Sequence, residues 1–261
     1  MVYDEKYWSG GDYPALAARL GGNLQQRMMM ALGSVTPGTT WLDVATGTGT
    51  IALMAARSGA RVTAQDFSPR MIELARAEAL GAGLSIEFDV GDCQHLPYAD
   101  ASFEVVTSAH GAVFAPDHQA VAAEFIRLCR PGGRIALSAW TMQPGITELA
   151  DLEAEFSGQP PVDEGSPFEW GDRDYVTSLL GGAFELRFLE GDSPIRGDSA
   201  EALTNQFWEH SPRTARLRAL LGPGREHELH GALLAFFSRH SGPRGVRVSR
   251  GDLITIGKRR N

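Results

Sequence analysis

The sequence predicts an α/β fold in which helices cover both faces of a mostly parallel sheet. Two observations carry this prediction. Short apolar or β-branched runs alternate with helical stretches between residues 40 and 140, and a glycine-rich loop follows the first run. A chain of 261 residues with 43% hydrophobic residues can bury such a core without a metal ion or a disulfide.

The first segment, residues 1–39, is predicted to be an N-terminal helical lid. Leucine and methionine recur there every four positions, which is the stripe of an amphipathic helix, and Gly21-Gly22 interrupts the stripe. Pro37-Gly38 ends the segment.

Residues 40–140 are predicted to form the ligand-binding core. The expected strands are Trp41–Ala45, Arg61–Gln65, Leu84–Val90, Phe103–Ser108 and Arg134–Trp140, with helices near 50–58, 69–81 and 117–130. Strands that alternate with helices form βαβ units, and a ligand of such a sheet binds at the carboxyl ends of the strands.

Residues 141–261 are predicted to complete the same domain. A proline-rich excursion with a helix near Ile146–Phe156 precedes a strand at Phe184–Leu189. The mostly helical stretch 199–240 is expected to be a cap inserted over the ligand end of the sheet, and Val246–Ile256 is expected to be one final strand.

Charge and composition exclude several classes of partner. A net charge of -8 and a pI near 5.4 argue against a surface that wraps nucleic acid. The sequence has no long apolar run of a membrane helix and no signal-peptide pattern at its start, and its two cysteines favour a reducing cytoplasm. The seven histidines show no paired ligand spacing, so no metal is expected.

The glycine loop points to a cofactor that contains adenosine. Its Gly47-x-Gly49-x-x-Ala52 spacing matches the dinucleotide-binding fingerprint at the start of a helix. Asp66 ends the second predicted strand, where it is placed to accept hydrogen bonds from ribose hydroxyls.

Asp43 decides between the adenosine cofactors. It lies in the first predicted strand, four residues before Gly47, where its carboxylate would repel a pyrophosphate. S-adenosylmethionine has no phosphate and carries an ammonium and a sulfonium, so an acid at this position favours it.

The sequence resembles the class I S-adenosylmethionine-dependent methyltransferases, in particular their ubiquinone/menaquinone-type and actinobacterial small-molecule branch. The resemblance is close over residues 40–140 and loose elsewhere. The matching segments are the loop Trp41–Gly49, Asp66 with the helix that follows, Gly91–Pro97, Phe103–Ser108, Phe114–Asp117, Leu128–Arg134 and Trp140.

This resemblance implies a Rossmann-like, seven-stranded, mostly parallel sheet whose last strand is antiparallel. It also implies roles for individual residues around the cofactor. The methionine part would lie against Asp43, Ala45, Thr46, Gly47 and Gly49, the ribose against Asp66, the adenine against Phe67, Met71, Asp92 and Cys93, and the transferring methyl near Ser108 and His110.

Several of these residues have simpler structural explanations. Asp92 could cap a turn and Asp66 could cap the helix that begins near Ser68-Pro69. Cys93 is best explained as a small buried apolar residue rather than a nucleophile.

Acceptor chemistry has fewer markers, because alignment supplies most of the rate of an in-line methyl displacement. His110, and His210 in the predicted cap, are the candidate bases, against the alternatives of a structural hydrogen bond and a solvated helix face. Tyr7 and Trp8 could belong to a lid and Trp140 to an acceptor pocket, or all three could pack in the core.

We therefore expect methyl transfer from S-adenosylmethionine to the oxygen, nitrogen or carbon of a small hydrophobic or aromatic compound of secondary metabolism. Two alternatives stay open: an NAD(P)-dependent oxidoreductase, and a cofactor-binding cyclase or other non-methylating protein on the same fold. The sequence leaves the choice between monomer and homodimer undecided.

Overall fold

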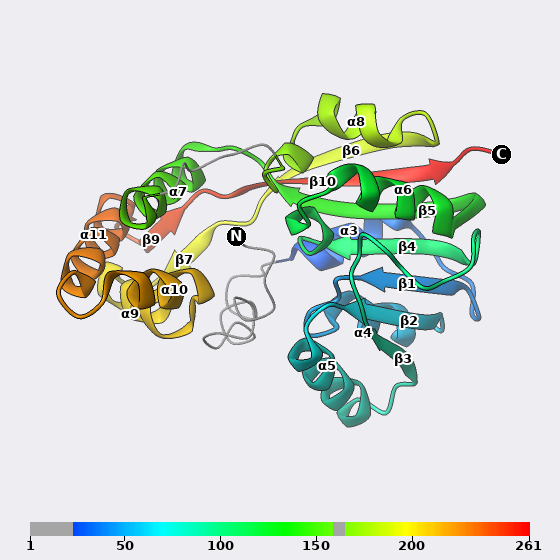
Figure 1. Ribbon diagram of the computed structural model, residues 1–261, viewed down its shortest axis with the longest axis horizontal. Coiled ribbons are helices and arrows are strands. Elements are labelled where there is room, and N and C mark those ends of the chain that lie inside the picture. Colours follow the sequence, from blue (N-terminus) through cyan, green and yellow to red (C-terminus); the bar gives the residue numbers. More distant parts are fainter. Residues whose placement is uncertain (1–22, 159–164) are drawn as a thin grey trace. The chain divides into compact units, whose positions relative to one another are not determined.

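The computed structural model has a seven-stranded sheet in the order β3-β2-β1-β4-β5-β10-β6 (Figure 1). The strands are β1 (Thr40–Val44), β2 (Arg61–Asp66), β3 (Ile86–Val90), β4 (Phe103–Ala109), β5 (Cys129–Trp140), β6 (Phe184–Asp192) and β10 (Gly251–Arg259). Strands β1 to β5 pair in parallel and β10 is antiparallel to β5. The predicted Rossmann-like, mostly parallel fold is therefore confirmed.

The structure describes residues 23–158 and 165–261, which divide into two compact units. The sheet unit contains residues 23–141, 165–191 and 252–261, and the second unit contains residues 142–158 and 192–251.

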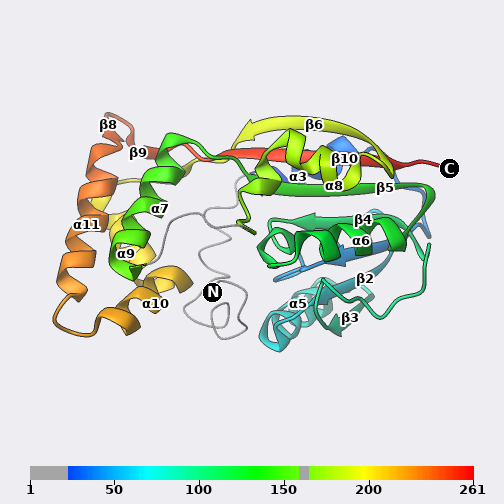
Figure 2. The same ribbon diagram turned by 45° about the horizontal axis from the view of Figure 1, so that its top comes forward.

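Helices cover both faces of the sheet. They are α3 (Leu24–Leu32), α4 (Thr50–Arg57), α5 (Pro69–Gly81), α6 (His118–Leu128) and α8 (Arg173–Leu180). The strand order runs one way from β1 to β2 and the other way from β4 to β5, so right-handed crossovers place α4 and α6 on opposite faces. The α6 side also carries α8, as the second view shows (Figure 2).

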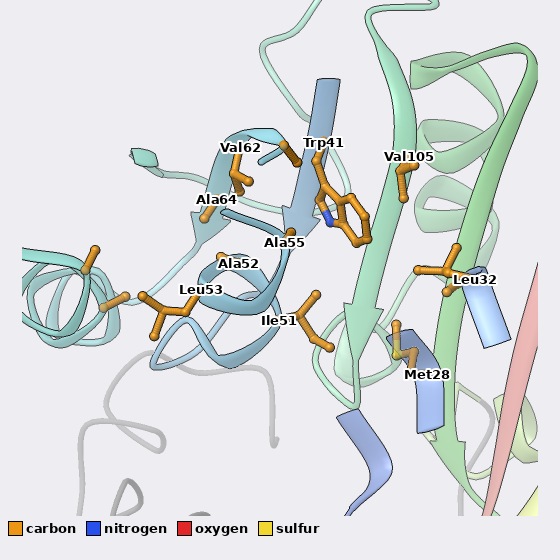
Figure 3. Close-up of a cluster of buried hydrophobic side chains, with 14 of the residues drawn as sticks. Met28, Leu32, Trp41, Ile51, Ala52, Leu53, Ala55, Val62, Ala64 and Val105 are labelled. Atoms are coloured by element: carbon orange, nitrogen blue, oxygen red, sulfur yellow. The ribbon is translucent and has the colours of Figure 1, made fainter. Parts of the chain in front are cut away.

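The core on the α4 side is apolar and contains one large aromatic residue. Trp41 of β1 lies between Ile51 of α4 and Val105 of β4, with Met28 of α3 nearby (Figure 3). Burying these side chains positions α4, whose N-terminus begins directly at the glycine loop, so the apolar core also fixes the loop.

The second unit has its own apolar core and its own small sheet. Helices α7 (Pro144–Ser157), α9 (Ala200–His210), α10 (Pro212–Leu221) and α11 (Glu226–Arg239) pack with the sheet β7-β9-β8, whose strands are Ile195–Gly197, Gly245–Val248 and Ser241–Gly242. The predicted helical stretch 199–240 is therefore three helices.

The prediction of one final strand over Val246–Ile256 is wrong. The segment forms β9 in the small sheet and β10 in the large one. The strand is interrupted at Arg250. The backbone N–H of Arg250 donates to Asp192 Oδ1 at 3.0 Å, and its side-chain Nε donates to the Ser193 carbonyl at 2.9 Å.

Two smaller differences concern neighbouring elements. Sequence analysis did not anticipate α8, which Asp172 caps by accepting a hydrogen bond from the Tyr175 N–H. Strand β5 begins at Cys129, before the predicted start, and its register with β4 shifts between Cys129 and Arg134. Within the described residues, no helix is both long and apolar enough to span a bilayer.

Candidate functional site

The loops at the carboxyl ends of β1, β2, β3 and β4 contain most of the predicted site residues. The strand order reverses between β1 and β4, and a sheet of this kind binds its ligand at that reversal. All four loops belong to the sheet unit, so their geometry is described within one compact body.

The loop after β1 turns through three residues with left-handed backbone conformations. Ala45 has φ 51°, Gly47 has φ 56° and Gly49 has φ 84°. A Cβ added to Gly49 would lie 3.2 Å from the Ala75 Cβ of α5, whereas one added to Gly47 would meet nothing within 4 Å. The Gly49 backbone therefore packs against a helix, while the Gly47 backbone borders open space.

Three consecutive backbone N–H groups of this loop donate to the end of β2. The Ala45 N–H donates to Gln65 Oε1 at 3.4 Å, the Thr46 N–H to the Gln65 carbonyl at 2.9 Å, and the Gly47 N–H to Asp66 Oδ2 at 2.8 Å. In a phosphate-binding loop such donors face the anion. Here acceptors within the protein already form hydrogen bonds with these N–H groups.

Asp43 is buried beneath the loop and bonded to hydroxyl groups. Thr46 Oγ1 donates to its Oδ2 at 2.5 Å and Thr107 Oγ1 donates to its Oδ1 at 2.7 Å, while the side chain is 2% exposed. Burial raises the pKa of Asp43 to about 6, although the two hydroxyls and the backbone of Ala52 lower it. Its carboxylate thus places negative potential directly behind the loop.

Asp66 holds two loops at once. Besides the Gly47 N–H, it accepts the Ser68 N–H on Oδ1 at 3.0 Å, at the start of α5. Burial raises the pKa of Asp66, and the backbone hydrogen bonds oppose that rise. A carboxylate has about four acceptor positions, so Asp66 retains capacity for ligand hydroxyls.

The predicted adenine side is formed by residues from three elements. Phe67 is half-buried after β2 and Met71 is buried in α5. Asp92 is half-buried after β3 and accepts the Gln94 backbone N–H at 2.8 Å, as well as the Gln94 side-chain amide. Cys93 next to it is buried.

The turn after β4 approaches the glycine loop closely. Ser108 Oγ accepts the Ala112 N–H at 2.9 Å, and His110 follows with a left-handed φ of 57°. A Cβ added to Gly111 would lie 2.4 Å from the Ala45 carbonyl oxygen. Only glycine allows the two loops to pass at this separation.

The rings of His110 and Trp140 stack on each other at the ends of β4 and β5. Their ring centroids are 3.6 Å apart and their planes differ by 14°. The backbone N–H of His110 donates to the Ser138 carbonyl at 3.2 Å, which fixes the turn to β5. The structure thus brings these two predicted acceptor-side residues together.

The remaining predicted residues belong to the second unit or lie outside the described residues. His210 ends α9 in the second unit, and its Nε2 lies 3.7 Å from Glu209 Oε2. Tyr7 and Trp8 lie outside the described residues. In the ranges 23–158 and 165–261, no group of three or more acidic, histidine or cysteine side chains could hold a metal ion.

Sequence reasoning missed Gln65, Thr107 and Gly111. Gln65 ends one predicted strand and Thr107 lies within another, and both strands contain other polar residues, so neither side chain stood out. Gly111 directly follows the candidate base, but its close approach to Ala45 depends on a contact between distant segments.

Comparison with known proteins identifies a methyltransferase domain. A profile of the methyltransferase domain matches residues 42–137, which include the glycine loop and β2 to β4. An uncharacterised protein of Mycobacterium tuberculosis is 36% identical over 217 residues, covering 82% of this chain and 79% of that protein. The demethylmenaquinone methyltransferase of Deinococcus radiodurans is 45% identical over 98 residues, covering 37% of this chain and 41% of that enzyme.

Solved structures share the fold at lower identity. A candidate methyltransferase from Bacillus halodurans superposes with a TM-score of 0.65 at 19% identity, covering 92% of this chain and all (100%) of that one. The [4+2]-cyclase SpnF superposes with a TM-score of 0.55 at 18% identity, covering 91% of this chain and 82% of that one. Together with the sequence relatives and the strand order, these matches show that the chain contains a methyltransferase domain and has the Rossmann-like fold of the methyltransferases.

Proposed function

We propose that the chain binds S-adenosylmethionine at the loops after β1, β2 and β3 and methylates a small hydrophobic or aromatic compound. One observation carries the cofactor assignment: the N–H groups of Ala45, Thr46 and Gly47 are held by Gln65 and Asp66, above the buried Asp43 carboxylate. Such a loop opposes phosphate and favours a ligand that carries positive charge.

The residues present fit this cofactor. Open space beyond Gly47 leaves room for a ligand against the loop backbone. Asp43 and Thr46 would orient the ammonium group, and Asp66 would accept hydrogen bonds from the ribose hydroxyls. Phe67 and Met71 would flank the adenine.

The adenine edge has its own set of partners in this proposal. Asp92 would accept from the exocyclic amine and the Cys93 backbone would lie beside the ring. When bound, S-adenosylmethionine supplies an electrophilic methyl group on a sulfonium.

The acceptor side is assigned to Ser108, His110 and Trp140. The stack of His110 and Trp140 places two flat aromatic rings at the ends of β4 and β5, which supports a planar acceptor. His110 is the proposed base where the acceptor must lose a proton, and His210 remains a second candidate. The low cysteine content supports a reducing, cytoplasmic setting.

Calorimetric titration with S-adenosylmethionine and S-adenosylhomocysteine tests the cofactor assignment. We expect both to bind the unmodified protein, and Asp66→Ala and Gly47→Val to weaken binding strongly. Valine is strained at the Gly47 φ of 56°, and its branched side chain would occupy the open space. Absence of binding, or unchanged binding in both variants, would reject the proposal.

Titration with reduced nicotinamide cofactor tests the oxidoreductase alternative in the same samples. Enhancement of its fluorescence on binding would favour an oxidoreductase, whereas the carboxylates around the loop predict none.

The fold relationship to a [4+2]-cyclase favours a second candidate, a protein that binds the cofactor without transferring its methyl. A radiolabelled methyl donor incubated with phenols, amines and polyketide-like compounds separates the two. Label in any product supports methyl transfer, and repeated silence despite tight cofactor binding supports the non-methylating protein.

A further inference from the structure

Gln65 is a buried amide in β2, next to the last residue of that strand. It is 1% exposed and precedes Asp66 at the end of β2. A buried amide is destabilising unless its donor and acceptor both find partners. The identity of those partners therefore indicates why an amide is present.

The partners of Gln65 lie in two different loops. Its Oε1 accepts the Ala45 N–H at 3.4 Å, in the loop after β1, and its Nε2 donates to the Gly91 carbonyl, in the loop after β3. Its own backbone carbonyl accepts the Thr46 N–H at 2.9 Å. Because β2 pairs with β1 on one side and β3 on the other, this one residue bridges both neighbours.

We propose that Gln65 is a positioning residue that sets the distance between the two halves of the cofactor site. The loop at Ala45 and Thr46 is the proposed methionine end, and Gly91 directly precedes Asp92, the proposed adenine contact. This inference rests on the proposed cofactor. Gln65 acts through the two loops and needs no contact with the ligand itself.

Loss of the amide should affect most strongly the ligands that span both loops. Without the amide, the Ala45 N–H and the Gly91 carbonyl each lose a buried partner, and both loops shift to find replacements. A ligand that touches one loop can follow its movement. A ligand that must touch both is sensitive to the distance between them, so its affinity falls more.

Gln65→Met tests this idea, because methionine keeps the length of the side chain but forms neither hydrogen bond. We expect Gln65→Met to weaken S-adenosylhomocysteine binding by about tenfold to a hundredfold, as for loss of one or two buried hydrogen bonds. Adenosine, which lacks the methionine half, is expected to lose less than about threefold. Calorimetric titration measures both.

Thr63→Val is the matched control. Thr63 Oγ1 lies 3.4 Å from Glu87 Oε2, a contact between the same two strands, β2 and β3, but away from the loops. We expect this variant to bind both ligands like the unmodified protein. Scanning calorimetry of each variant reports whether the fold persists.

Gln65→Glu provides a signature that packing alone would not produce. An ionised glutamate accepts from the Ala45 N–H but repels the Gly91 carbonyl, whereas a protonated one donates to that carbonyl as the amide does. The ratio of its affinity to that of the unmodified protein should therefore rise as the pH is lowered from about 8 to about 5, since burial raises a carboxyl pKa. The corresponding ratio for Gln65→Met should stay flat.

Each outcome decides the inference. Normal S-adenosylhomocysteine binding by Gln65→Met, or equal losses for S-adenosylhomocysteine and adenosine, would overturn it while leaving the proposed cofactor intact. Absence of binding by the unmodified protein would instead reject the proposed function, and the inference with it. If Gln65→Met does not fold, the pH response of Gln65→Glu decides, and a flat ratio overturns the inference.

Discussion

Two buried carboxylates of the sheet unit are stabilised in different ways. Asp252 of β10 is fully buried, and Arg27 of α3 binds both of its oxygens, at 2.8 Å and 3.0 Å. Asp43 of β1 is equally buried, yet hydroxyl groups bond its oxygens, and no ion pair to it occurs in the part of the chain that the structure describes.

The difference separates a structural acid from a binding acid. A carboxylate with its own cation has little potential left for a ligand, whereas one held by neutral donors keeps its charge available. Burial without a cation is unfavourable, which is why the pKa of Asp43 is raised to about 6. Strain of this kind is typical of functional sites.

Removal of the cation should give the largest effect on stability. Arg27→Ala leaves Asp252 buried without its partner and is expected to lower the free energy of unfolding by about 3 kcal/mol. This is the lower end of the usual range, because Arg27 is 23% exposed and water can reach the pair. Urea unfolding measures it, with Arg27→Lys as a control that keeps the charge. A change below about 0.5 kcal/mol would contradict the structural role.

Removal of the charge on Asp43 should instead lower ligand affinity and leave stability unchanged or higher. Asparagine can keep hydrogen bonds to Thr46 and Thr107, so we expect stability at neutral pH to stay equal or to rise. Affinity for S-adenosylmethionine should fall about tenfold to a hundredfold, because the ammonium group loses its counter-charge. Calorimetric titration and urea unfolding of Asp43→Asn and Asp252→Asn compare the two acids directly. Loss of stability without loss of affinity in Asp43→Asn would contradict the distinction between a structural acid and a binding acid.

The pH dependence sharpens the comparison. The folded-state pKa of Asp43 is about 6 and its ordinary value is 3.8, so the folded protein holds more protons between these values. The stability of the ligand-free protein should therefore fall as the pH rises from about 4 through about 6, while affinity for S-adenosylmethionine rises by up to about tenfold.

Titration from about pH 5 to about pH 7 measures this affinity change, and urea unfolding measures the stability. In Asp43→Asn both profiles should flatten. If the Asp43→Asn profile is as steep as that of the unmodified protein, the pH dependence would instead come from Asp66, whose pKa burial also raises.

Thr46→Val should have the smallest effect. It removes the hydroxyl that donates to Asp43 Oδ2, which raises the pKa of Asp43 further. The affinity profile should then move to higher pH by less than about one unit. Thr46→Ser, which keeps the hydroxyl, should leave the profile in place, and an equal shift in both variants would contradict this explanation.

Local patterns predicted the first five strands and the loop well. The glycine spacing and the short apolar runs act within a few residues, so the sequence displays them directly. The seven-stranded, mostly parallel sheet with its antiparallel last strand followed from the family resemblance.

Features that depend on distant contacts were not predictable. The alternation of Val246–Ile256 is interrupted at Arg250, but the change of sheet there depends on hydrogen bonds from Arg250 to Asp192 and Ser193. The residues near Gln65 in the sequence do not indicate its hydrogen-bond partner, because that partner, Gly91, is 26 positions away. The sequence likewise located His110 but not its stacking on Trp140.

The placement of β10 affects the order in which the sheet can assemble. It is the last of the large sheet's strands in chain order, yet it lies inside the sheet, between β5 and β6. Seven residue pairs join it to β5, from Asp252 opposite Trp140 to Lys258 opposite Arg134. During synthesis, β1 to β5 can pair as they emerge, but β6 has to wait for a strand made about sixty residues later, after the whole second unit.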